Sequence, residues 1–156
     1  MDDITLARAL HVLSVVHWIG GVSFVTLVIL PLARHEGGTL GTALFDRIEH
    51  RFSAQVRVSI PLAGLSGFWM TWRLDLWDRF AQASFWWMTA MVALWTVFML
   101  AVFVVEPLLR PRFEAIAARA PDALLRRSIR IHLVLLALAA ATILGATAGA
   151  HGLYLF

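Results

Sequence analysis

The stretch ALHVLSVVHWIGG, residues 9–21, places His11 and His17 inside a long apolar run near the N-terminus. An imidazole is rare in hydrocarbon and usually has a partner there, so a histidine within a membrane span is by default a candidate functional site. A third histidine, His151, follows another apolar run near the C-terminus. Because side chains on facing helices commonly build cofactor and metal sites, these three histidines are the candidate metal ligands of the chain.

The composition sets the class of protein and limits the chemistry of such a site. Hydrophobic residues make up 60% of the 156 positions and charged residues 15%, which indicates an integral membrane protein. The chain has no cysteine, which excludes disulfides, iron–sulfur clusters, thiolate metal sites and a covalently attached c-type haem. The acidic start and long apolar run are not typical of a cleaved signal peptide, so we expect the first helix to stay.

Four apolar segments are each long enough to cross a bilayer, at about residues 6–32, 53–72, 85–106 and 131–151. They predict an all-α fold, an integral membrane antiparallel four-helix bundle, with a single domain over residues 1–156. Arg57 and Pro61 interrupt the second segment. A charge inside a span is costly unless it is paired, so we expect Arg57 to pair with Glu106 or to share a network with Arg110. The alternative is that Arg57 reaches the headgroups by snorkelling.

The arginines are distributed unequally between the expected loops. Residues 33–52 and 107–130 together contain nine of them, whereas the segment between the second and third spans contains Arg73 and Arg79, balanced by two aspartates. The nine are Arg34, Arg47, Arg51, Arg110, Arg112, Arg119, Arg126, Arg127 and Arg130. The positive-inside rule therefore predicts a multi-pass protein with both termini on the outer side of the membrane, which is the periplasmic side if the membrane is a bacterial inner membrane. Within the second cytoplasmic loop, residues 113–127 are expected to form a surface helix broken at Pro121.

This topology sorts the histidines by depth. His11 and His151 share a level near the periplasmic end, which makes them a matched pair of ligands. At 1.5 Å and 100° per residue, His17 lies about 9 Å deeper than His11 and is turned by about 120°. His17 shares its helix face with Gly20 and Gly21, which would leave a flat surface beside it. His35 and His50 are expected to be solvated, and His132 to be an interfacial anchor or a site residue.

A haem b would need axial imidazoles, small residues for the ring and cations for its propionates. We expect His11 as one axial ligand with His151 or His17 opposite, and Arg8 and Arg73 near the propionates. The room for the ring would come from the glycines of the spans, namely Gly20, Gly21, Gly64, Gly67, Gly145 and Gly149. Copper is the rival ligand, because thioether and imidazole groups suit Cu(I) and three methionines fall in the same half of the bundle. These are Met70, Met88 and Met91.

Three functions follow from these alternatives. The first is a membrane-embedded b-type haem protein that performs electron transfer or redox chemistry at the periplasmic half of the bundle. The second is a copper-binding or copper-transport membrane protein, and the third is a cofactor-free membrane subunit. An oxidoreductase activity is left open. The expected partners are the lipid bilayer, a quinone or redox protein for the haem function, and a second copy of the chain in a homo-oligomer, with no nucleic acid.

The pattern formed by Ala9, Leu10, His11, Trp18 and the two following glycines resembles the first helix of two families. These are the CopD-type copper-resistance membrane proteins and the HemJ-type protoporphyrinogen oxidases. The stretches FDRIEHRFSAQVR, SGFWMTWRLDLWDRF, FVVEPLLRPRF and TAGAHG resemble a small bacterial branch of the same kind. The resemblance implies a four-helix unit, with His11 as haem ligand in the HemJ-type pattern and copper import, more distantly, in the CopD-type pattern. The HemJ-type pattern also includes a functional lysine, and the absence of any lysine here counts against protoporphyrinogen oxidation.

Overall fold

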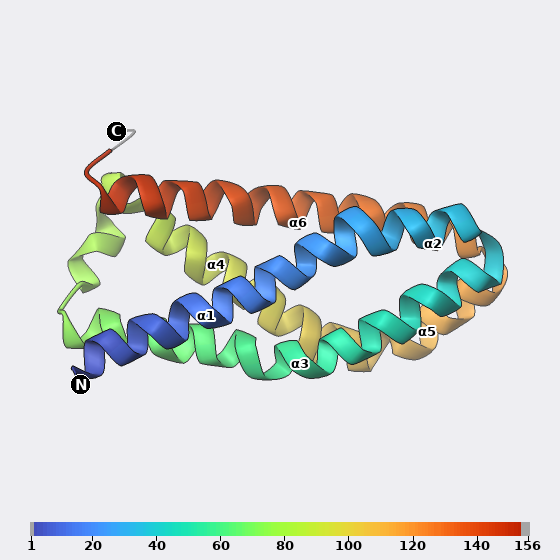
Figure 1. Cartoon of the computed structure of the whole chain (residues 1–156), viewed down its shortest axis with the longest axis horizontal. Coiled ribbons are helices and arrows are strands. Elements are labelled where there is room, and N and C mark those ends of the chain that lie inside the picture. The colour runs from blue at the N-terminus through green and yellow to red at the C-terminus, as the bar shows by residue number, and fades with distance from the viewer. Residues whose placement is uncertain (1, 154–156) are drawn as a thin grey trace.

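A computed structural model describes residues 2–153 and shows four long helical rods that lie side by side (Figure 1). The first rod consists of α1 (Asp3–Phe24), a π-helical segment (Val25–Ile29) and α2 (Leu30–Glu36). The second is α3 (Gly38–Arg73). The third consists of α4 (Trp86–Leu100), a π-helical segment (Ala101–Val105) and α5 (Glu106–Arg119), and the fourth is α6 (Pro121–Ala150). Two short 3₁₀ turns, Trp77–Ala81 and Ala83–Phe85, connect α3 to α4. The predicted all-α antiparallel four-helix bundle is confirmed.

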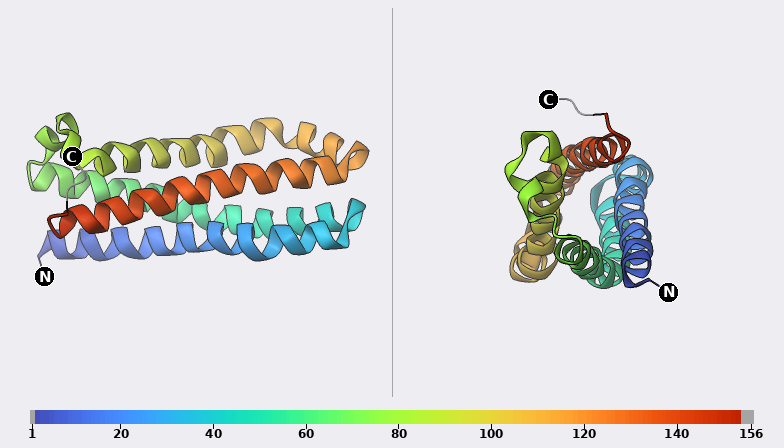
Figure 2. Two further views of the ribbon diagram at one scale, coloured as in Figure 1. Left: turned by 90° about the horizontal axis from the view of Figure 1, so that it is seen from above. Right: turned by 90° about the vertical axis from the view of Figure 1, so that its left-hand side faces the viewer.

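Consecutive rods run in opposite directions, so the start of α1 and the end of α6 lie at the same end of the bundle (Figure 1). We call this the terminal end, which carries Asp3, Arg73 and Ala150, and the opposite end the turn end, which carries Gly37 and Ala120. The end-on view in Figure 2 shows the rods around a ring in the order α1, α3, α4 and α6. The closest packing is between α1 and α3, which lie antiparallel along their length.

The two π-helical segments each stand just before a proline. Pro31 follows the first segment and Pro107 follows the second. Proline has no N–H to donate and its ring clashes with the carbonyl four residues earlier, so an ordinary α-helical turn is unfavourable there. A locally wider turn accommodates the ring, and the backbone N–H groups of Leu30 and Glu106 bond to the carbonyls five residues before them. Each rod therefore continues past its proline.

The structure corrects the predicted loop at residues 33–52. The helix of the first rod continues to Glu36, and α3 begins at Gly38, so the connection is the single residue Gly37. Gly37 and Gly38 have φ angles of 68° and 52°, which side-chain-bearing residues rarely adopt. Charged residues do not end a helix by themselves, so the arginines of this region lie on helices. With 36 residues, α3 is about 54 Å long, which exceeds the ~30 Å hydrocarbon core.

The predicted surface helix at residues 113–127 is also wrong. Its first half is the end of α5, and its second half is the start of α6, with Ala120 between them. Pro121 is the first residue of α6, a position where the missing N–H costs nothing because that group has no helical partner. The predicted break at Pro121 is therefore a reversal of direction between two long rods.

The side chains between the rods form two buried hydrophobic clusters. The larger lies between all four rods and includes Trp18, whose ring meets that of Phe98 edge to face at a centroid distance of 4.9 Å. The smaller cluster lies at the turn end and includes Leu30 and Leu125, both fully buried. Both clusters contain residues from rods that are far apart in sequence. Their packing therefore fixes the register of the first rod against α3.

Three of the rods are long and apolar enough to cross a membrane, namely Asp3–Glu36, Ala83–Arg119 and Pro121–Ala150. The rod formed by α3 is not among them. This agrees with the interruption of its apolar segment by Arg57 and Pro61. Because α3 packs against the other rods throughout its length, it still belongs to the same membrane bundle.

Candidate metal centre

His11 points from α1 toward α3. Its Nδ1 lies 2.8 Å from the backbone oxygen of Ala63, and the hydroxyl of Ser66 lies 3.4 Å from the same nitrogen. A carbonyl oxygen can only accept, so Nδ1 carries the proton and donates it to Ala63, which leaves the lone pair of a neutral imidazole on Nε2. Histidines that bind metals commonly hold their other ring nitrogen in this way.

The ring of His11 fits here because Gly67 has no side chain. A Cβ at that position would stand 3.2 Å from Cε1 of His11 and 3.3 Å from its Nδ1. The missing side chain of Gly67 therefore leaves the space that the imidazole of His11 occupies. The half-buried His11 is held between two helices whose packing fixes its depth.

His17 has a different environment. Its Nδ1 lies 3.1 Å from Oγ of Ser59 and its Nε2 lies 3.3 Å from Oε1 of Gln55. The amide oxygen accepts, so Nε2 is the donor, and Nδ1 accepts the hydroxyl proton of Ser59. Both ring nitrogens of His17 are therefore engaged within the chain. His17 offers no free lone pair in this arrangement, which distinguishes it from His11 as a ligand.

His151 follows the last turn of α6 and is exposed. Its Nδ1 lies 2.8 Å from the backbone oxygen of Thr147, four residues earlier on the same helix. By the same argument as for His11, Nε2 of His151 has the free lone pair. His11 and His151 both lie in the half of the bundle next to the terminal end, but no contact between them is present. In residues 2–153 there is no cluster of three or more His, Cys, Asp or Glu side chains that could hold a metal ion.

The glycines expected to make room for a flat ring are mostly covered by aromatic side chains. A Cβ at Gly21 would stand 2.1 Å from the Phe52 ring, and one at Gly64 would stand 2.4 Å from the Trp95 ring. Gly145 and Gly149 face Trp86 and Trp87 in the same way, at 2.4 and 2.0 Å. Only Gly20 among the six has open space beside it, with no atom within 4 Å of a Cβ placed there. These glycines let helices and tryptophan rings approach closely.

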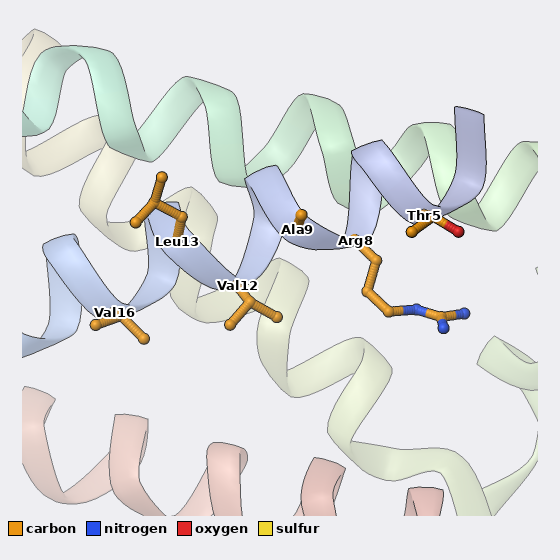
Figure 3. A pocket seen from close by; sticks show the side chains of 6 residues that line it. All are labelled: Thr5, Arg8, Ala9, Val12, Leu13 and Val16. Carbon is orange, nitrogen blue, oxygen red and sulfur yellow. The ribbon is translucent and has the colours of Figure 1, made fainter. Parts of the chain in front are cut away.

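The two cations expected near the haem propionates have different surroundings. Arg73 donates to Asp3 at 2.8 Å, so its charge is already balanced by the first helix. Arg8 has no recorded partner within residues 2–153. It lines a shallow groove of about 510 Å³ on α1 (Figure 3). The other lining residues are Thr5, Ala9, Val12, Leu13 and Val16. His11 does not line this groove, so the groove and the histidine belong to different faces of α1.

Of the three methionines considered as copper ligands, Met70 lies closest to His11 by register. It stands on α3 three residues after Gly67 and four after Ser66, so it shares their helix face. Helical side chains lean toward the N-terminus of their own helix. Because α1 and α3 are antiparallel, this general tendency would direct the side chains of His11 and Met70 toward each other. Met88 and Met91 lie on α4.

The remaining histidines lie toward the turn end. His35 is exposed on α2 and has no recorded partner within the described residues. Nδ1 of His50 lies 3.3 Å from a guanidinium nitrogen of Arg110. His132 donates from Nδ1 to the backbone oxygen of Ser128 at 2.9 Å. None of them approaches His11.

The predicted pair between Arg57 and Glu106 is confirmed, with Nη2 of Arg57 3.3 Å from Oε1 of Glu106. Ser53 was not identified from the sequence, and its hydroxyl donates to the other carboxylate oxygen of Glu106. Ser53 and Arg57 are four residues apart and so share one face of α3. This spacing could have indicated from the sequence that Ser53 joins Arg57 and Glu106 in one group. Arg110 instead pairs with Glu114 at 3.1 Å.

Glu49 lies one helical turn from Ser53 toward the turn end, outside the predicted span. Burial, together with the nearby carboxylates of Glu106 and Asp46, raises the pKa of Glu49 to about 7, and Arg110 opposes this effect. A carboxyl with such a pKa changes its charge near neutral pH. The turn end thus contains one group that titrates in the physiological range because of its surroundings.

Comparison with known proteins adds one finding. The family model for copper resistance protein D, CopD, matches residues 46–147, which is more than half of the chain and covers the region from α3 into α6. No curated protein matches the chain, and no solved structure matches it. The matched region does not include α1. The match confirms the CopD-type resemblance, and this chain belongs to the CopD family of membrane proteins.

Proposed function

We propose that this chain binds copper within the membrane as its cargo, with His11 as the imidazole ligand. The observation that carries the proposal is the hydrogen bond from Nδ1 of His11 to Ala63, because it leaves Nε2 free and fixes the ring between α1 and α3. Membership of a family named for copper resistance supports copper over other metals. Without any cysteine in the chain, the ligands must be histidine, methionine or carboxylate side chains.

We further propose Met70 as the thioether ligand that accompanies His11. A soft thioether and a neutral imidazole are a donor set that suits Cu(I). The register of α1 and α3 supports this pair, since Met70 lies one turn beyond Gly67, which touches the His11 ring. His151 is the second imidazole candidate, because its Nε2 is also free. His17 is not included in the set, since both of its nitrogens are already engaged.

The haem b function that the histidines also predicted has less support. A porphyrin needs a broad flat space between helices, and aromatic rings fill the space beside Gly21, Gly64, Gly145 and Gly149. Of the expected propionate partners, Arg73 is already paired with Asp3. A visible absorption spectrum of the purified protein separates the two functions, because a bound haem gives a Soret band and Cu(I) gives none.

The orientation in the membrane is part of the same proposal. We propose that the chain lies in a bacterial inner membrane with its terminal end on the periplasmic side, where His11 would meet copper entering from outside. The nine arginines near the turn end support this orientation by the positive-inside rule. Alkaline phosphatase fused to the C-terminus should be active, and a fluorescent protein that folds only in the cytoplasm should be dark at the same position. The reverse pattern would overturn the orientation.

The copper function is tested by titrating purified protein with Cu(I) in competition with a chromophoric chelator. We expect one tight equivalent for the parent, and a loss of affinity of at least tenfold in both His11→Ala and Met70→Leu. The matched controls are His35→Ala and Met99→Leu, since His35 is exposed at the far end and Met99 packs against the core. If the two site variants bind Cu(I) as tightly as the parent does, the proposed ligands are wrong.

A further inference from the structure

The groove on α1 has a polar end and an apolar end (Figure 3). Its polar residues, Thr5 and Arg8, lie toward the terminal end, and its deeper part is lined by Val12, Leu13 and Val16. These three side chains are 55%, 67% and 64% exposed, so the described chain leaves them largely uncovered. The eleven residues from Thr5 to Val16 correspond to about 16 Å of helix. This length is close to one leaflet, which is half of the ~30 Å hydrocarbon core.

Arg8 is a cation without a counter-ion in the described chain. The three ion pairs within residues 2–153 do not include it. The nearest carboxylates in the sequence are engaged elsewhere, because Asp3 binds Arg73 and Asp2 caps the backbone N–H of Ile4. Figure 3 shows the guanidinium of Arg8 directed toward the terminal end. An unpaired guanidinium at the edge of the hydrocarbon favours an anionic oxygen partner, and a phosphodiester provides two such oxygens.

The groove ends where α1 enters the core of the bundle. Ile19 continues the same stripe of the helix and is only 9% exposed in the larger hydrophobic cluster, and Ser23 after it is half-buried. The end of this rod, α2, packs against α6, whereas no residue of α6 lines the groove. Figure 1 shows the same divergence, with the first rod close to α6 at the turn end and apart from it at the terminal end. A second helix that crosses the membrane would be held off this face beyond Val16, but a molecule confined to one leaflet fits it.

We propose that this groove binds one anionic phospholipid of the leaflet at the terminal end, with its phosphate on Arg8 and one acyl chain along the three exposed apolar side chains. The polar and apolar ends of the groove match the headgroup and the chain of a lipid in that orientation. The uncompensated charge of Arg8 favours an anionic headgroup over a zwitterionic one, in which a cationic group offsets the phosphate. The hydroxyl of Thr5 can donate a second hydrogen bond to the phosphate. The proposal does not depend on copper binding, because His11 does not line the groove.

Photoactivatable lipids test this site directly. The protein is reconstituted in phosphatidylcholine vesicles that contain a small share of phosphatidylglycerol or phosphatidylcholine with a diazirine in one acyl chain, and mass spectrometry locates the labelled residues. We expect the phosphatidylglycerol probe to label residues 12–16 at least about fivefold more than the phosphatidylcholine probe, which corresponds to ~1 kcal/mol for one arginine. Equal labelling by the two probes would overturn the proposal. Labelling by neither probe would also overturn it, and would show that another chain covers the groove.

Three variants separate the charge of Arg8 from the shape of the groove. Arg8→Gln should remove the preference for phosphatidylglycerol, whereas the matched control Arg34→Gln, exposed at the other end of the same rod, should keep it. Ala9→Trp retains Arg8 but fills the groove, so it should lower the labelling of residues 12–16 by both probes. Circular dichroism should give the same helix content for all three variants and the parent. A preference that persists in folded Arg8→Gln, or unchanged labelling in folded Ala9→Trp, would overturn the assignment of the lipid to this groove.

Discussion

Glu49 is expected to make the stability of this protein depend on pH, and Glu49→Gln should remove that dependence. The pKa of Glu49 is about 7 in the folded protein instead of an ordinary value of 4.5, chiefly because of burial. Below the ordinary value, both the folded and the unfolded chain hold the proton, and Glu49 has no effect. Above it the unfolded chain releases the proton first, so the folded state loses stability as the pH rises toward 7. One pKa unit corresponds to about 1.4 kcal/mol, so the full penalty approaches roughly 3 kcal/mol.

The assay is the free energy of unfolding in mixed micelles, measured by titration with a denaturing detergent at pH 5 and at pH 8. Because pH 5 already lies above the ordinary pKa of 4.5, Glu49→Gln should be more stable than the parent by about 1 kcal/mol at pH 5 and by about 3 kcal/mol at pH 8. All other titrating groups are common to both proteins and cancel in the difference. Glu36→Gln is the control, since Glu36 is exposed at the end of α2. Curves for parent and Glu49→Gln that stay parallel from pH 5 to pH 8 would refute the reasoning.

Two further predictions concern packing within the bundle. Glu106→Gln removes the negative partner of Arg57 and should lower the free energy of unfolding by about 1 kcal/mol, the modest value expected because Arg57 is 42% exposed. An unchanged midpoint in thermal unfolding would show that the pair adds nothing. Gly149→Ala puts a Cβ 2.0 Å from the Trp87 ring and should cost about 1–3 kcal/mol, whereas Ala150→Ser at the next, exposed position should cost little. Equal melting temperatures for the Gly149 and Ala150 variants would contradict the close packing.

The long helices and the connection between the second and third rods could be predicted from the sequence, but the two connections at the turn end could not. Apolar runs of about twenty residues indicate spans by length alone. The charged stretches on either side were interpreted as loops, although arginine, alanine and leucine all favour helix. The two reversals depend on single residues, namely Gly37 with its positive φ and Ala120 before Pro121. A composition-based prediction does not distinguish a charged loop from a charged helix that leaves the membrane.

In the candidate site, too, some features could be predicted from the sequence and others could not. The partner of Arg57 could be predicted as one of the alternatives, because an unpaired charge within a span is costly and Glu106 ends the neighbouring span on the same side. The hydrogen bonds of His11 and His17 could not, since they depend on the register of α1 against α3. That register decides which histidine keeps a free nitrogen, with His11 bonded to a carbonyl and His17 bonded to Ser59 and Gln55. The sequence placed the two histidines on different faces and predicted His11 as a ligand, but it left open whether His151 or His17 is the second one.

X-ray absorption spectroscopy of the Cu(I)-loaded protein tests the central claim most directly, because it identifies the atoms bound to copper. The parent should show both imidazole nitrogen and thioether sulfur in the first coordination shell. His11→Ala should lose the imidazole contribution, Met70→Leu should lose the sulfur contribution, and His17→Ala should retain both. A parent spectrum without sulfur, or an imidazole contribution that survives in His11→Ala and disappears in His17→Ala, would contradict the assignment of copper to His11 and Met70.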